Sequence, residues 1–475
     1  MEVHFFLMDV AAIRANDFGQ VSHEGAGTAL RHVLKEEFYR TMTLIEGRVP
    51  LWWVMPPGVD DLEYAAIGAQ LAQAEGLDVD DFVDLGNLSG VPVREFLGTA
   101  LWQMHKALSD PLKSVLKMAL VATYLETDGP VQLLCDQLKA QVFKARRQEI
   151  VDPYLAVFKT VEDYYQRQGD LVTVDLMRKC FYLKVAPDLH KADLLKLERD
   201  EKSTIMIDLI GQWGWSWREF EHLSAFDEWK MPEYRALGGE IHKYLMQTAV
   251  KLVRRSRAAT DDQQLQDVEL KVLKNRVESI YVAKPGKIAA ERYLRREEPV
   301  YDEAFFSHDG LLWHLSESAP RRGSDIVSVM SAERVAALTA WLVFNRRFNP
   351  STSFHMVPNA TDVALVNIQD LLGRLSLLLK GGNVALNRAD LAKPAYPRDI
   401  IVVGNLERPE GLKRVDDIDL IYRSSWNELY TDHLPLEKLK AWFLSNKQSD
   451  SSIHLWVPRS SEVKKLADSL VSVLS

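Results

Sequence analysis

Helical periodicity over residues 58–275 constrains the fold of this chain more than any other feature of its sequence. Apolar residues recur at spacings of three and four in six segments: 60–75, 96–126, 131–145, 151–168, 171–185 and 234–258. That spacing places the apolar side chains on one face of a helix, and such a face must be covered by a neighbour. We therefore predict a helical domain with short connections between residues 58 and 275.

Different patterns flank this domain. Residues 1–57 predict a strand over 2–10, a helix over 28–45 and a strand over 51–55, ending at the breaker Pro56-Pro57-Gly58. From residue 276 onward, predicted strands at 279–283, 310–315, 400–405 and 418–422 accompany predicted helices at 332–348, 367–379, 436–444 and 461–474. The expected fold class is thus mixed, α/β and α, with domains at 1–57, 58–275 and 276–475, the last cut short at its end.

Composition and charge exclude several classes of protein. The hydrophobic content of 47% and charged content of 26% are typical of a soluble globular protein. A net charge of −9 argues against a general nucleic-acid surface, and no apolar run is long enough to span a membrane. Two cysteines cannot build a disulfide framework, which fits a reducing compartment. We expect a cytoplasmic protein with no nucleic-acid partner and no membrane span.

Two Asp-x-Asp pairs stand out, because paired carboxylates can hold Mg²⁺ beside phosphates. Asp78 and Asp80 follow Gly76 at the start of a predicted helix, where acidic residues serve as caps. Asp417 and Asp419 lie on a predicted strand and mimic a nucleotidyltransferase signature. The sequence contains no GxxxxGK[ST], GxSxG, HExxH or paired CxxC motif.

Three long motifs resemble one known family. They are EEFYRT with GRVPLWWVMP (36–41 and 47–56), DLMRKCFYLKV (175–185) and DLIYRSSWNEL (419–429). With the opening EVHFFLMD and the later SDPLKSVLK and QWGWSW, these stretches resemble the class I bacterial adenylate cyclases in order and spacing along nearly the whole chain.

The resemblance implies that residues 1–57 are the C-terminal part of a polymerase-beta-type nucleotidyltransferase domain. It also implies a reaction, the conversion of ATP to 3′,5′-cyclic AMP and pyrophosphate. In that reaction two divalent ions, Mg²⁺ or Mn²⁺, assist attack of the ribose 3′-hydroxyl on the α-phosphate.

In that family a Gly-Ser loop and an Asp-x-Asp strand precede the segment that resembles EVHFFLMD. Here only Met1 precedes it. We therefore expect an internal fragment, inactive alone, that also lacks the C-terminal region through which a protein regulator would act. The alternative is a non-catalytic nucleotide-binding or regulatory remnant. Because Asp417 and Asp419 fall on the third family motif, we do not assign them to the catalytic metals.

By the same resemblance, Glu2 is the expected third metal carboxylate and catalytic residue. A solvated terminal glutamate and a role for Asp9 in its place are the alternatives. Arg40 and Arg48 are expected to contact the triphosphate, which needs cations. For each arginine the alternative is a surface ion pair with a nearby glutamate (Glu36, Glu37 or Glu46).

Lys113 and Lys117 complete the expected set of nucleotide-binding residues. They are four residues apart in SDPLKSVLK, so they share one helix face, with Ser109 or Asp110 as the cap and Pro111 in the first turn. The resemblance implies that such a helix supplies a lysine to the phosphates. The alternative is a solvated face.

Overall fold

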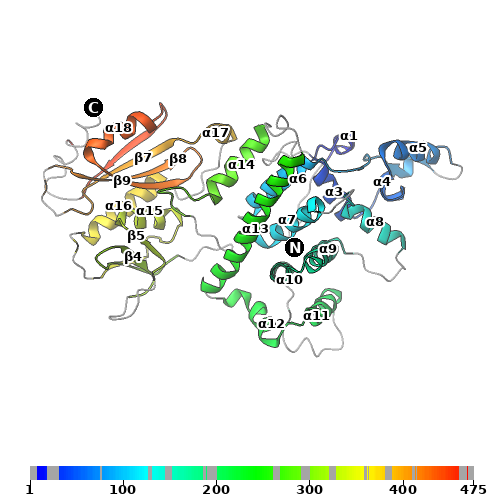
Figure 1. The fold of residues 1–475 in the computed structure, drawn as a ribbon, viewed down its shortest axis with the longest axis horizontal. Coiled ribbons are helices and arrows are strands. Elements are labelled where there is room, and N and C mark those ends of the chain that lie inside the picture. The colour runs from blue at the N-terminus through cyan, green and yellow to red at the C-terminus, as the bar shows by residue number, and fades with distance from the viewer. Residues whose placement is uncertain are drawn as a thin grey trace. The chain divides into compact units, whose positions relative to one another are not determined.

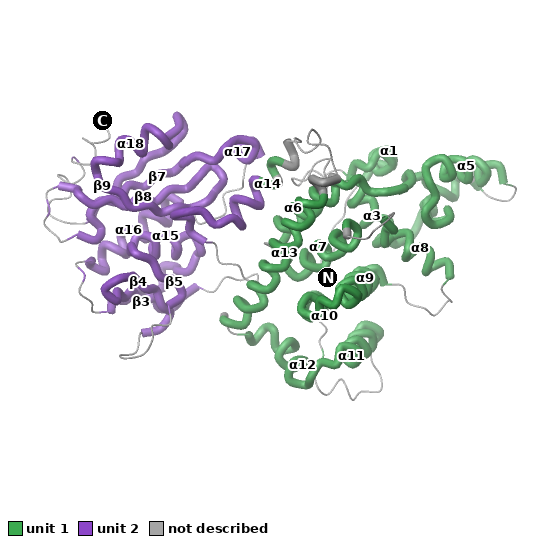
Figure 2. Tube along the Cα trace, viewed as in Figure 1, with its two compact units in different colours: residues 1–274 green, residues 275–475 purple. Residues whose placement is uncertain are grey.

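A computed structural model describes the chain except for residues 1–7, 19–30, 75–77, 108, 127–130, 145–151, 186–188, 190–199, 230, 260–267, 290–299, 320–327, 358–360, 362, 380–387, 409–411, 413, 459–467 and 469–475. The chain forms two compact units, residues 1–274 and 275–475 (Figure 2). The first is almost wholly helical and the second mixes helices with two four-stranded sheets, which confirms the expected mixed α/β and α class. The nucleotidyltransferase remnant stays a prediction.

The first unit is built from helices, with α7 among them (Figure 1). They are α1 (Val10–Arg14), α3 (Arg31–Thr41), α4 (Leu51–Val54), α5 (Asp61–Leu71), α6 (Val93–Lys106), α7 (Pro111–Glu126), α8 (Leu134–Lys144), α9 (Pro153–Arg167), α10 (Leu171–Val185), α11 (Glu201–Trp213), α12 (Trp217–Ser224) and α13 (Met231–Ala259). Helix α7 contacts α6, α9, α10 and α13, and its Val115, Met118 and Ala119 are fully buried. A helix with neighbours on several sides needs apolar residues beyond a single stripe.

Two expectations for this unit need correction. The strand predicted at 51–55 is wrong, because a two-residue strand, β1 (Val49–Pro50), leads directly into helix α4. Pro50 is the N-cap of α4, and the ring of Trp52 stacks on Tyr39 with centroids 4.2 Å apart. The short apolar run is thus a helical turn that buries Trp52, a case that periodicity cannot separate from a strand. The strand β2 (Phe82–Val83) pairs with β1 in parallel.

The helix predicted at 96–126 is two helices, α6 and α7, because Pro111 cannot continue the first and fits the first turn of the second. The strand predicted at 2–10 falls mostly on residues outside the described part of the chain. Its last residue, Val10, begins α1, and Asp9 is the N-cap, accepting a hydrogen bond from the N–H of Ala12 at 3.0 Å.

The second unit alternates helices and sheets in four layers (Figure 1). One sheet has the order β10-β7-β8-β9, built from β7 (Pro397–Gly404), β8 (Asp417–Ser424), β9 (Leu429–Pro435) and β10 (Ser452–Trp456). The other has the order β5-β4-β3-β6, built from β3 (Glu303–His308), β4 (Trp313–Ser316), β5 (Met330–Ala332) and β6 (Ser353–Met356). The helices are α14 (Val268–Tyr281, which begins before the unit boundary), α15 (Val335–Phe344), α16 (Leu365–Leu379), α17 (Arg388–Leu391) and α18 (Leu436–Asn446).

Alternation along β7 explains this layering. Ile401 and Val403 pack with α15 and α16, which also contact the other sheet, whereas Ile400 and Val402 pack on the opposite face with α18. In helix α15 every residue from Val335 to Val343 except Ala337 is buried, because the helix lies in an inner layer. The strand predicted at 279–283 is wrong, since helix α14 continues to Tyr281. The helix predicted at 461–474 lies outside the described residues, apart from Asp468.

Candidate functional site

A cavity of about 860 Å³ opens in the first unit. One wall is a face of α5, where Asp61, Ala65, Gly68 and Ala69 follow the helical spacing and the small residues leave room. The loop 86–92, GNLSGVP, forms another wall, and Tyr64 and Leu88 add apolar surface. The volume lies within the range of small-molecule sites, which are roughly 300–1,000 Å³.

The cavity residue His32 is held by the carboxylate of Glu95, whose side chain is 1% exposed. It accepts hydrogen bonds from the backbone N–H groups of His32 and Val33, at 2.7 and 3.3 Å, and so caps the start of α3. Its second oxygen lies 2.7 Å from Nδ1 of His32. A carboxylate can only accept there, so Nδ1 carries a proton.

Asn16 completes this chain of contacts. Its side chain lies 3.3 Å from Nε2 of His32, which in the neutral ring accepts from the Asn16 amide N–H. This orientation leaves Oδ1 of Asn16 buried and without a hydrogen-bond partner among the described residues. A buried unpaired carbonyl costs about 1–3 kcal/mol, so the contact with His32 favours the ring form that leaves the fewest polar atoms unpaired.

Asp84 organises the opposite side. Its Oδ1 accepts from the Tyr64 hydroxyl at 2.9 Å and from the N–H of Gly86 at 2.8 Å. Its Oδ2 lies 3.1 Å from the guanidinium of Arg14, a half-exposed pair. Next to it, the Asn87 amide donates to Oδ1 of Asp61 and to the carbonyl of Val59, both at 2.9 Å. Both wall carboxylates therefore have fixed positions.

A buried lysine lies behind this wall. Lys35 is 1% exposed, and its Nζ donates to the carbonyl oxygen of Arg14 at 3.4 Å. Burial lowers the pKa of Lys35 to about 8, against the opposing attraction of Asp84. Gly86 has a φ of +83°, and a Cβ there would lie 2.9 Å from this Nζ, so the loop passes close to the lysine.

The structure pairs the expected phosphate-binding cations of α3 and α7 with carboxylates. The Arg40 side chain is 4% exposed, and its Nε donates to Glu36 at 3.0 Å, one helical turn away. Lys117 lies 2.5 Å from Glu37, and attraction to Lys117 and Arg40 lowers the pKa of Glu37 despite burial. Lys113 is close enough to act on the same carboxylate. The fold thus brings Arg40, Lys113 and Lys117 together around two glutamates.

The other predicted residues lie elsewhere. The Arg48 side chain is 58% exposed and lies 3.4 Å from Asp80, whose side chain is 83% exposed. Glu2 lies outside the described residues, and Asp9 caps α1, which is the ordinary role of an aspartate at that position. The roles of Glu2, Arg40, Arg48, Lys113 and Lys117 in nucleotide binding stay predictions.

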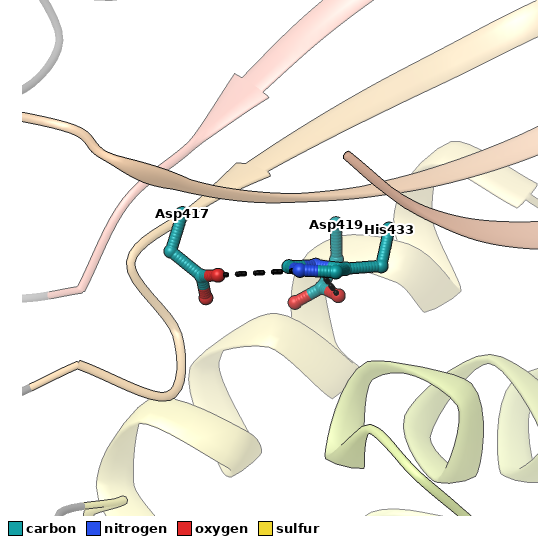
Figure 3. A group of neighbouring side chains, drawn as sticks. All are labelled: Asp417, Asp419 and His433. Carbon is teal, nitrogen blue, oxygen red and sulfur yellow. Dashed lines mark ion pairs between the residues drawn. The ribbon is translucent and has the colours of Figure 1, made fainter. Parts of the chain in front are cut away.

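In the second unit, Asp417 and Asp419 form a group with His433 (Figure 3). The aspartates are two residues apart on β8 and so point to one face, and His433 lies opposite Asp419 on β9. The imidazole nitrogens lie 3.6 Å from Asp417 and 3.4 Å from Asp419. The hydrogen bond to Asp419 raises the pKa of His433. Two carboxylates and an imidazole are a donor set that suits a divalent ion.

Arg334 already holds these carboxylates. Its Nε and Nη2 each donate to Asp419 at 2.9 Å, Nη2 also donates to Asp417 at 2.5 Å, and Nη1 lies 3.3 Å from Glu407. A metal ion would have to displace this guanidinium, so the group fits a metal poorly while Arg334 is present. No sequence signal identified Arg334, because it lies 85 residues before Asp419.

Sequence reasoning also missed the cavity. The signals available were the Gly- and Asn-containing loop 86–92 and the asparagine at position 16, which adopts a φ of +61°. Neither pattern shows that the two segments meet.

Among the helices of the described residues, none combines the length and apolar character that a membrane crossing needs.

Two family models match the chain. Residues 1–53 match the adenylate cyclase NT domain, and residues 91–290 match the second domain of class-I adenylate cyclase. Together the two matches cover just over half of the chain. No solved structure matches it.

Curated relatives match over most of the chain. The adenylate cyclase of Salmonella typhimurium is 27% identical over 471 residues, which is 91% of this chain and 54% of the relative. Those of Escherichia coli strain K12 and Pasteurella multocida are 26% and 25% identical, over 91% and 96% of this chain. The chain spans about half the length of these relatives. On these matches, the chain belongs to the class I adenylate cyclase family.

Proposed function

We propose that this chain contributes the matching half of an adenylate cyclase, which converts ATP to 3′,5′-cyclic AMP and pyrophosphate. The observation that carries the proposal is the match to curated adenylate cyclases along 91% or more of the chain. The cavity beside α5 supports it, because its size suits a small-molecule substrate.

Four basic residues have roles in this proposal. Arg48 meets the triphosphate, because a half-exposed guanidinium with a weak surface partner remains available to a phosphate. Lys113 and Lys117 add positive charge from α7, although Glu37 competes for it. Arg40 contributes less directly, since its guanidinium is buried against Glu36.

Divalent ions, Mg²⁺ or Mn²⁺, would activate the ribose 3′-hydroxyl and stabilise the leaving pyrophosphate. Glu2 is the proposed ligand, as the sequence resemblance implies. The group of Asp417, Asp419 and His433 is not assigned to this task, because Arg334 occupies its carboxylates.

The test is a chimera in which this chain replaces the matching segment of the Salmonella typhimurium enzyme. Purified chimera with ATP and Mn²⁺ should form cyclic AMP, and the same chimera carrying Glu2→Gln should form at least about 100-fold less, as expected for loss of a metal carboxylate. A chimera that melts cooperatively but forms no cyclic AMP would refute the proposal. We also expect the 475-residue chain alone to form no cyclic AMP in the same assay.

A second candidate function is nucleotide binding without catalysis. The cavity beside α5 favours it, because a cavity of this size suits a small-molecule ligand whether or not a reaction follows. One comparison distinguishes the two candidate functions. The catalytic proposal requires product from the chimera, whereas the binding proposal requires only that the chain bind ATP.

A further inference from the structure

We propose that residues 284–288 form a latch on the open edge of strand β9, held in place by the buried carboxylate of Glu428. The latch gives a role to the motif DLIYRSSWNEL (419–429), because the second half of that motif supplies the carboxylate. The latch and the motif both belong to the second unit. The inference does not depend on the reaction that the chain performs.

The backbone of the latch pairs with β9 as an added strand. β9 is an edge strand, so one row of its N–H and C=O groups has no partner within the sheet. The N–H of Thr431 donates to the carbonyl oxygen of Gly286 at 2.8 Å. The N–H of Ile288 donates to the carbonyl oxygen of Leu429, also at 2.8 Å. These two bonds flank one antiparallel pair, so the latch covers the first half of the edge.

A tight turn brings the latch to this edge. Pro285 and Gly286 occupy its two central positions, and the N–H of Lys287 donates to the carbonyl oxygen of Lys284 at 3.0 Å, which is the pattern of a type II turn. Gly286 has a φ of +69°, and a Cβ there would clash with the carbonyl oxygen of Thr431. Only glycine satisfies both the turn and the close approach of the two backbones.

One buried carboxylate binds both lysines of the latch. The side chain of Glu428 is fully buried, and its Oε1 lies 3.0 Å from Nζ of Lys284 and 3.1 Å from Nζ of Lys287. Its Oε2 accepts from the hydroxyl of Ser424 at 3.2 Å. Lys287 also donates to the carbonyl oxygen of Val282 at 2.7 Å, directly after the end of α14. Loss of the carboxylate would leave two ammonium groups without their shared partner.

Few other contacts hold the latch. Its one buried apolar side chain is Ile288, whereas Pro285 and Gly286 are exposed. The central strand β7 differs, because its residues 400–403 are all fully buried. A segment with one buried apolar side chain and two edge hydrogen bonds should open at a lower free energy than such a strand. The latch should therefore open locally while the sheet stays folded.

Opening of the latch has two consequences. It frees the backbone that follows α14, and it exposes N–H and C=O groups of β9 to which another strand can pair. The match to the second domain of class-I adenylate cyclase ends at residue 290, two residues beyond the latch. The end of that matched segment is thus held by a motif that lies outside it.

Two substitutions should open the latch, and each has a matched control. Gly286→Ala introduces the backbone clash, whereas Gly310→Ala tests another positive φ, of +103°, where no described atom beyond the chain neighbours lies within 4 Å of the added Cβ. Glu428→Gln removes the buried charge. Glu278→Gln removes a carboxylate that is 33% exposed and lies 3.5 Å from Lys284.

The experiment is hydrogen exchange of the full chain at pH 7, read by mass spectrometry of the peptides that carry Ile288 and Thr431. In the unchanged chain these two amides should be at least tenfold less protected than those of β7, because the latch opens without the sheet. Gly286→Ala and Glu428→Gln should lower the protection of both amides at least tenfold further, with little change in β7. The two control variants should exchange like the unchanged chain.

Trypsin gives a second measure of the same opening. It cleaves after Lys287 but not after Lys284, because a proline follows Lys284. Cleavage after Lys287 should be at least tenfold faster in Gly286→Ala and Glu428→Gln than in the unchanged chain. The control variants should be cleaved there at the unchanged rate.

Two results would overturn the inference. If the folded variants keep full protection at Ile288 and Thr431, neither the close backbone approach nor the carboxylate holds the segment. If β7 loses protection together with these two amides, the segment belongs to the cooperative core and is not a latch. Lys284→Met, at a side chain that is 27% exposed, is a milder change to which both criteria apply if the stronger variants do not fold.

Discussion

Arg334 binds Asp419 through two hydrogen bonds of 2.9 Å, with both nitrogens of one guanidinium edge facing both oxygens of the carboxylate. The Asp419 side chain is 3% exposed, and the same guanidinium also holds the buried Asp417. Bidentate pairs of this geometry are among the strongest charge-assisted contacts in proteins. The pair therefore joins the start of α15 to strand β8.

Removing this arginine should destabilise the second unit. Arg334→Met leaves two buried carboxylates with only the half-exposed His433 beside them, and breaking a buried pair typically costs about 3–5 kcal/mol of unfolding free energy. Denaturant unfolding of the full chain at pH 7 measures the loss. The control is Arg408→Met, whose half-exposed side chain lies 3.4 Å from the exposed Asp416 and should cost less than about 1 kcal/mol. Equal losses in the two variants would contradict the assignment.

Mn²⁺ should bind Asp417, Asp419 and His433 only when the Arg334 guanidinium is absent. In Arg334→Met the ion can approach Asp417, Asp419 and His433, so it should raise the melting temperature by binding the folded state. In the unchanged chain Arg334 fills the site, and the ion should have little effect. A similar rise in both proteins would show that the guanidinium does not exclude the metal.

Arg40 and Arg48 should behave differently when changed to alanine. Arg40→Ala leaves Glu36 buried without its cation, so it should lower the unfolding free energy by about 3–5 kcal/mol. Arg48→Ala should cost under about 1 kcal/mol, because both partners of its ion pair are largely exposed. In the chimera, Arg48→Ala should raise the KM for ATP by roughly one to two decades. A large loss of stability with normal kinetics would make Arg48 a structural residue.

Two glycines of the cavity should respond oppositely to alanine. A Cβ at Gly68 would make ordinary contacts, 3.6 Å from Leu51 and 3.7 Å from Met55, so Gly68→Ala should stabilise α5 by about 0.5–1 kcal/mol. At Gly86 the φ is +83°, and the Cβ would meet Lys35 and the Arg14 carbonyl at 2.9 and 3.1 Å. Gly86→Ala should therefore destabilise by more than about 1 kcal/mol. Thermal unfolding of the two variants measures whether each substitution raises or lowers the stability of the protein.

The pH dependence of stability should reveal Lys35. An unfolded lysine keeps its proton to about pH 10.5, whereas burial lowers the pKa of Lys35 to about 8. Between these values the unfolded chain binds more protons, so the unfolding free energy rises with pH, and the penalty is fully present at pH 7 and below. Lys35→Met should be more stable than the unchanged chain at pH 7. The difference should shrink between pH 8 and 9.5, and a Lys35→Met variant that is less stable at pH 7 would show that the charge is needed.

Local rules determined many elements of this chain from its sequence. The helix at 171–185 has the predicted bounds, and β7, β8 and α18 lie within a few residues of the prediction. Each carries a strong period, and α9, for example, begins at Asp152 as an N-cap. The family could also be recognised from the sequence, because long motifs such as DLMRKCFYLKV occur in the same order as in the family.

Tertiary structure decided what no local pattern specifies. The run 51–55 became a helix because Trp52 packs on Tyr39, and α14 extends over a segment that reads as a strand. The partners of Arg40, Lys117 and Arg334 decide whether these charges are available to a ligand, and two of these three pairs join residues 80 or more positions apart. The cavity depends on Asn16, α5 and the loop 86–92 meeting in space. Sequence periodicity reports which face of an element is buried, but only packing determines which residue it meets.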